Sequence, residues 1–128
     1  QYEKLVEAAE ERALRAEFQM AIRIFNEAMA VKPSYLANSD RVNQLHALLM
    51  SQNTPVDVTF NSDGRTWVSI SNFRMLGQFD TTTMKIMPGD YEIVGRRKGY
   101  QDVLLLLQVR NGSYPPVVSV TCTMRADR

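Results

Sequence analysis

The sequence predicts an α+β protein in which three helices precede a small antiparallel β-sandwich of about seven strands. Apolar residues recur with a period of 3.6 up to about residue 50, and with a period of 2 from residue 56 onwards. Gly, Pro and Asn interrupt the second part at short intervals, which is typical of short strands joined by turns. We therefore expect a helical segment over residues 1–52, a linker at Ser51 to Pro55, and a β-sandwich over residues 55–125.

The helices are predicted from their apolar stripes and their ends. The first covers residues 2–16, and the second covers residues 18–31 and ends before Pro33, because proline cannot continue a helix. The third is expected from about Ser34, whose hydroxyl suits an N-cap, to Met50. The three stripes consist of Leu5, Ala9 and Ala13; of Phe18, Ala21, Ile22, Phe25, Ala28 and Met29; and of Val42, Leu45, Leu48 and Leu49.

The first two helices carry small and large residues at spacings that let them pack closely. The second helix has a small, aromatic, small and proline pattern at Ala21, Phe25, Ala28 and Pro33, and the first helix has Leu5, Ala8 and Ala9 at matching positions. This pattern resembles the tetratricopeptide repeat, except that Arg12 stands where the repeat has tyrosine. The resemblance implies a peptide-binding array with further repeats upstream, closed here by the third helix as a cap. The alternative is an ordinary antiparallel helical hairpin.

The first strands follow directly after the linker. Val56, Val58 and Phe60 alternate with polar residues, which indicates a half-buried strand. We expect a hairpin turn at residues 61–64 and a returning strand at residues 66–71, with a looser segment up to Asp80.

The middle of the β-segment is organised by two glycine turns. A strand at residues 84–87 meets Pro88-Gly89, where we expect a tight turn with positive φ at Gly89. The chain returns from Tyr91, and Gly99-Tyr100 marks the next turn.

These turn residues carry a second resemblance. Pro88, Gly89, Tyr91, Ile93, Gly99 and Tyr100 follow the spacing of the C-terminal half of PEGA domains, which are small extracytoplasmic β-sandwiches. The Pro-Glu-Gly-Ala tetrapeptide itself is absent, and Asn61-Ser62-Asp63-Gly64 stands in its place. The resemblance covers residues 55–124. It implies a bacterial envelope protein that faces the periplasm.

Four consecutive leucines occupy the strand expected at residues 103–109. An alternating strand needs only half of them for one face, so the run indicates a strand covered on both sides. We expect Leu105 and Leu107 to face the sandwich core, and Leu104 and Leu106 to be covered by the helical segment. The residues expected to make this interdomain contact are Leu45, Leu48 and Leu49; a second copy of the chain or a partner would cover the leucines otherwise. Asn111-Gly112 predicts a hairpin to the last strand, with Cys122 turned inward.

Composition limits the function further. The chain has 128 residues, a formal net charge of +1 and one cysteine. The small net charge gives no field to attract nucleic acid, and one cysteine excludes an internal disulfide. This fits a reducing compartment or a disulfide-free periplasmic protein equally well.

No run is long and apolar enough to cross a membrane, so we expect no membrane contact by this chain itself. The first residue is Gln, so we expect a processed chain with an anchor upstream.

Enzyme motifs are absent from the sequence. It has no phosphate-binding glycine loop and no hydrolase or metalloprotease motif, and its one histidine is His46. Turn positions explain most of the aspartates, whose spacing matches no calcium loop. We therefore predict no enzymatic activity, no cofactor and no metal.

Two sets of residues are candidates for a binding surface. Arg96, Arg97 and Lys98 next to Tyr100 could bind an anionic glycan or nucleic acid, but a solvated turn that protects a sheet edge explains them more simply. The leading hypothesis is a non-enzymatic protein-interaction or scaffolding module of a bacterial envelope protein. The alternative is a module that binds cell-wall carbohydrate through exposed aromatic residues. The candidate aromatics are Trp67, Tyr100 and Tyr114.

Overall fold

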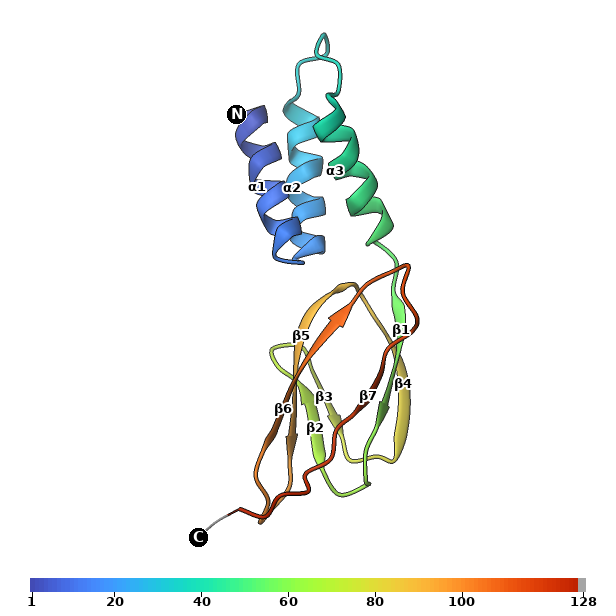
Figure 1. Ribbon diagram of the computed structural model, residues 1–128. Coiled ribbons are helices and arrows are strands. Elements are labelled where there is room, and N and C mark those ends of the chain that lie inside the picture. Colours follow the sequence, from blue (N-terminus) through green and yellow to red (C-terminus); the bar gives the residue numbers. More distant parts are fainter. Residues whose placement is uncertain (127–128) are drawn as a thin grey trace. The chain divides into compact units, whose positions relative to one another are not determined.

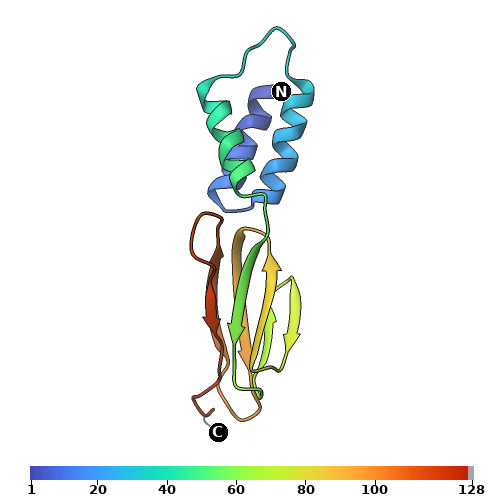
Figure 2. The same cartoon turned by 90° about the vertical axis from the view of Figure 1, so that its right-hand side faces the viewer.

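The computed structural model describes residues 1–126, in which three helices are followed by seven strands (Figures 1 and 2). The chain divides into a helical unit and a β-unit. The first comprises residues 1–55 together with the turn Met87–Gly89, and the second comprises residues 56–86 and the chain from Asp90 onwards. The α+β class and the order of helices before strands agree with the sequence-based prediction.

The helical unit consists of α1 (Tyr2–Leu14), α2 (Phe18–Val31) and α3 (Asp40–Ser51). α1 and α2 form an antiparallel hairpin (Figure 1), and the chain reverses between them at Ala16, whose φ is 60°. Alanines on both helices are completely buried, which lets the two backbones approach closely. The core comprises Val6, Ala9, Ala13, Ala16, Phe18, Ala21, Phe25, Ala28, Val42, Leu45 and Leu49.

The start of α3 differs from the prediction. Ser39 is the N-cap, and its Oγ accepts a hydrogen bond of 3.3 Å from the backbone N–H of Val42. Ser34 lies in the preceding loop, which begins with a turn closed by the Leu36 N–H and the Pro33 carbonyl. Both serines suit a cap by type. The turn at Pro33 delays the helix until the second of them.

The β-unit contains two sheets. The seven strands are β1 (Val56–Asn61), β2 (Trp67–Ile70), β3 (Arg74–Gly77), β4 (Thr81–Ile86), β5 (Gly89–Arg96), β6 (Val103–Val109) and β7 (Val117–Ser119). One sheet has the order β4-β1-β7 and the other β3-β2-β5-β6. β1 pairs antiparallel with β4 but parallel with β7, so the sandwich is mostly antiparallel.

Two predicted hairpins are crossings between the sheets. β1 and β2 belong to different sheets, and so do β6 and β7. In the turn at Asn61 to Gly64, the N–H groups of Ser62 and Gly64 donate to the carbonyls of Asp80 and Phe79. The turn is therefore hydrogen-bonded to the segment that leads into β4, and not to a hairpin partner.

The expectation for Gly89 is also wrong. Among the described residues, the glycines with positive φ are Gly64, Gly77, Gly99 and Gly112, and Gly89 already begins β5. The basis for backbone strain in a Gly89→Val variant is therefore removed. Gly99, in the other predicted turn, does adopt the left-handed conformation with φ of 81°.

The core of the β-unit lies between the two sheets. Its buried residues are Val56, Val58, Phe60, Val68, Ile70, Ile86, Ile93, Leu107, Val109 and Val120, with Leu105 packed against them. Cys122 is buried and free, as the alternation of the last strand predicted.

One buried polar residue connects the turn before β2 with the end of the chain. The hydroxyl of Thr66, which is fully buried, accepts a 3.1 Å hydrogen bond from the Cys122 N–H. The same hydroxyl donates to Asp63 Oδ2 over 3.3 Å. Asp63 Oδ1 in turn accepts hydrogen bonds from the N–H groups of Arg65 and Thr66. This network fixes the chain between β1 and β2.

Candidate functional site

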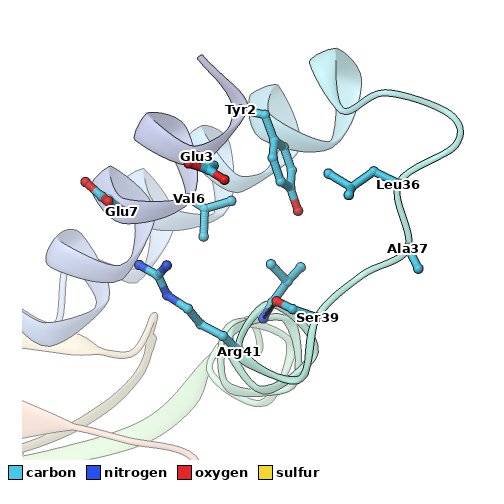
Figure 3. A pocket seen from close by; sticks show the side chains of 9 residues that line it. Tyr2, Glu3, Val6, Glu7, Leu36, Ala37, Ser39 and Arg41 are labelled. Carbon is cyan, nitrogen blue, oxygen red and sulfur yellow. Dashed lines mark hydrogen bonds between the residues drawn. The ribbon is translucent and has the colours of Figure 1, made fainter.

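A groove lies in the helical unit between the beginnings of α1 and α3 (Figure 3). The loop at residues 36–39 closes one side, and the cavity volume is about 270 Å³. The lining residues are Tyr2, Glu3, Val6, Glu7, Leu36, Ala37, Ser39, Arg41 and Val42.

The floor and one end of the groove are apolar. Val6 and Val42 are almost completely buried and form the floor. At one end of the groove, Tyr2 from α1 and Leu36 from the loop extend toward each other (Figure 3). Leu36 remains 41% exposed, so it presents apolar surface to a ligand. The groove can therefore accept an apolar side chain.

Three of the other lining residues are charged, and the opposite charges lie on different helices. Glu3 and Glu7 lie one helical turn apart on α1, and Arg41 lies on α3. Within residues 1–126, no ion pair occupies Glu3 or Glu7. These two carboxylates provide an acidic rim to which the cationic group of a ligand can bind.

Arg41 is held in place by Glu10 of α1. Its Nε donates to both carboxylate oxygens, at 2.8 and 3.0 Å, and its Nη2 also donates to Glu10. The hydrogen bond from Arg41 lowers the pKa of Glu10, and the same carboxylate raises the pKa of Arg41. The ion pair joins α3 to α1 along the groove. Both side chains are partly exposed, so the pair fixes geometry more than it adds stability.

The basic cluster predicted from the sequence is largely neutralised. Arg96 pairs with Asp102 at 3.4 Å, and Arg97 lies 3.7 Å from Asp63. Desolvation alone would raise the pKa of Asp63, but the hydrogen bonds it accepts and the charge of Arg97 outweigh it and lower the pKa. Of the three cations, only Lys98 has no ion pair in the described part of the chain. The arrangement favours the interpretation of a charged turn.

The candidate aromatic residues do not form one surface. Trp67 opens β2 opposite Arg96, and Tyr100 follows in the turn between β5 and β6, at the same end of that sheet. Tyr114 follows β6 and so lies beyond the opposite end. The guanidinium of Arg97 lies 4.1 Å from the centre of the Tyr100 ring and covers one face of it. Trp67 is 53% exposed and is the one of these three residues that lies in a strand, whereas Tyr114 is 96% exposed in a loop.

The leucines predicted to join the two units occupy different environments. Leu45 and Leu49 belong to the core of the helical unit itself, so neither presents a free side chain, whereas Leu48 is exposed. Leu104 and Leu106 point away from the core of the β-unit, as predicted, and are 62% and 84% exposed.

His46 stacks on Phe25 with the ring centres 5.5 Å apart, at the surface of the helical unit. Within residues 1–126, no group of three or more acidic, histidine or cysteine side chains could hold a metal ion. No described helix is long and apolar enough to cross a membrane.

Comparison with known proteins adds no relative. No protein-family model matches this sequence, and no curated protein is significantly similar to it. The resemblances to the tetratricopeptide repeat and to PEGA domains therefore remain predictions from the sequence.

The sequence did not identify the groove. Val6 and Tyr2 are one helical turn apart and so share a face of α1, which was a usable signal. Leu36 and Arg41 carried no such signal, because they reach the groove only through the loop and the packing of α3.

Proposed function

We propose that this chain is a non-enzymatic protein-interaction module that acts as a scaffold in a bacterial envelope protein. The observation that carries the proposal is the groove between α1 and α3, with its apolar floor and acidic rim. An extended segment of a partner protein fits these features if it carries an apolar side chain next to a lysine or arginine.

The envelope location rests on the resemblance to PEGA domains. The residues that carry it, from Pro88 to Tyr100, lie in β5 and in the turns at its two ends. The resemblance of the helical unit to the tetratricopeptide repeat also supports a binding role, since both resemblances imply binding modules and neither implies an enzyme.

Site-specific photocrosslinking in the native envelope tests the proposal. A photoreactive amino acid replaces Leu36 at the groove, and in the control it replaces Leu14, an 88% exposed leucine at the other end of α1. We expect a crosslinked protein from position 36 that is absent from position 14. The purified partner should then bind the chain, and Glu3→Lys with Glu7→Lys should weaken that binding about tenfold or more, because two attractive charges become repulsive.

Equal crosslinking from both positions, or binding that is unaffected by the two charge reversals, would contradict the proposal. Binding to purified cell-wall glycan that is lost in Trp67→Ala would instead favour the carbohydrate-binding alternative. The exposed ring of Trp67 is the observation that keeps this alternative open.

A further inference from the structure

The strand β6 forms a sheet edge whose outer side is unpaired. It is the last strand in the order β3-β2-β5-β6. Within residues 1–126, no backbone hydrogen bond joins β6 to any element other than β5. Residues 124–126 pair with residues 99–101, through Gln101 and the bridge between Tyr100 and Arg125, and no residue up to Ala126 in this segment forms a hydrogen bond to β6.

The other three sheet edges have features that prevent pairing with another chain. β3 has four residues and an irregular register against β2. β4 carries Lys85 on its exposed face. β7 has three residues and follows Pro115-Pro116. Short strands, irregularities, lysines and prolines are the usual means by which edges avoid association.

β6 has none of these features. It is seven residues long and contains four consecutive leucines, with no charge, glycine or proline. Leu104 and Leu106 are exposed on its outer face. An edge strand of this length and composition is suited to pairing with another strand.

The charges that flank β6 select a second copy of the same strand. Asp102 directly precedes it and Arg110 directly follows it. In an antiparallel pair of two copies related by a two-fold axis, opposing side chains lie on the same face of the sheet only if one residue lies directly opposite its own copy. An axis through Leu106 places Asp102 opposite Arg110 of the second copy, and Arg110 opposite Asp102. Leu105 then lies opposite Leu107, so the inner faces also match.

Neighbouring ion pairs fit this register. Asp102 binds Arg96, and Arg110 binds Asp90 at 2.8 Å, within one copy. Across the interface the order becomes Arg96, Asp102, then Arg110 and Asp90 of the second copy, so that the signs alternate. We propose that two copies of this chain pair through β6 about a two-fold axis at Leu106, joining two four-stranded sheets into one continuous sheet.

Sedimentation of the purified chain over a concentration series tests whether the dimer forms. We expect a shift from 14.6 kDa to twice that mass as the concentration rises. Leu106→Lys should abolish the shift, because it places two like charges opposite each other at the axis. The matched control is Met75→Lys, since Met75 is 69% exposed on the opposite edge strand of the same sheet. This control should dimerise like the original chain. Trp67 fluorescence verifies that each variant is folded.

Charge reversal tests the register. Asp102→Arg and Arg110→Asp should each weaken the dimer about tenfold or more, since each creates two like-charge contacts. When the two variants are mixed, both contacts become attractive, and a mixed dimer should form and be detected by native mass spectrometry. A chain that stays monomeric at every concentration would overturn the proposal. A dimer that Leu106→Lys leaves intact, or a mixture without mixed dimers, would overturn it equally.

Discussion

The hydroxyl of Thr66 gives the sharpest test of how the β-unit is stabilised. Replacing Thr66 with Val keeps the shape of the side chain and removes only its ability to form hydrogen bonds. The hydroxyl accepts from the buried Cys122 N–H and donates to the carboxylate of Asp63. Both bonds are lost in Thr66→Val.

The two losses differ in size. Cys122 is 1% exposed, so its N–H has no access to water, and leaving such a donor without an acceptor costs about 1–3 kcal/mol. The bond to Asp63 is longer, at 3.3 Å, and this carboxylate keeps two backbone N–H donors and partial exposure. We therefore expect a loss of about 2 kcal/mol in the free energy of unfolding, nearly all of it from Cys122.

Urea unfolding followed by the fluorescence of Trp67 measures this loss directly. Trp67 is the single tryptophan and lies in β2, so the signal reports on the β-unit alone. With a slope of about 1 kcal/mol per M for a small unit, the midpoint should fall by about 2 M urea. The control is Thr83→Val, which removes a hydroxyl from the exposed pair with Thr59 and should change the stability by less than about 0.5 kcal/mol.

An unchanged midpoint for Thr66→Val would refute the reasoning, because the buried N–H would then have found another partner at no cost. An equal loss in Thr66→Val and Thr83→Val would refute it as well, since burial would no longer distinguish the two hydroxyls.

Three further predictions concern other contacts. Gly95→Ala places a Cβ 2.9 Å from Val120 Cγ1 and should destabilise the β-unit by about 1–3 kcal/mol, as measured by urea unfolding; Val120→Ala in the same chain should recover part of the loss. Ser39→Ala removes the N-cap of α3 and should lower the stability of the helical unit by about 1 kcal/mol, as measured by the thermal loss of circular dichroism at 222 nm. Ser34→Ala should have no measurable effect. An equal loss of stability in both variants would contradict the assignment of Ser39 as the N-cap. Folding lowers the pKa of Asp63 below its ordinary value of 3.8, so the carboxylate contributes stability above about pH 4 that is lost as the pH falls through the folded-state pKa. Asp63→Asn should therefore flatten the acid side of the stability curve of the β-unit, and an unchanged curve would contradict this.

The sequence predicted those features that depend on the spacing of neighbouring residues. The span of α2 follows from helical spacing and from Pro33, and the strand β1 follows from its alternation. α1 ends at Leu14, two residues before the predicted end, because the chain reverses at Ala16 with positive φ. The opposite directions of Leu104 and Leu105 follow from the two-residue period of a strand. Burial of Cys122 follows from the same rule.

Features that depend on distant partners could not be predicted in this way. The turn chemistry at Asn61 to Gly64 is compatible with a hairpin or with a crossing, and the choice depends on hydrogen bonds to Phe79 and Asp80. The start of α3 required a choice between two serines of the same type. The groove depends on Leu36, which reaches it from a loop. The burial of Leu45 and Leu49 in the helical core depends on the packing of all three helices.

The parallel pairing of β1 with β7 also determines when the β-unit can fold. β1 is the first strand to be synthesised and β7 the last, and the hydrogen bond from Ser62 to the Val120 carbonyl joins residues 58 positions apart. Such distant pairings make folding slow, whereas the α1–α2 hairpin needs only neighbouring residues and can form while synthesis continues. Until the final strand leaves the ribosome, one edge of β1 has no partner in its own chain. Its apolar residues Val58 and Phe60 then also lack part of their cover, so a nascent chain that pauses at this stage offers a surface for chaperones or for aggregation.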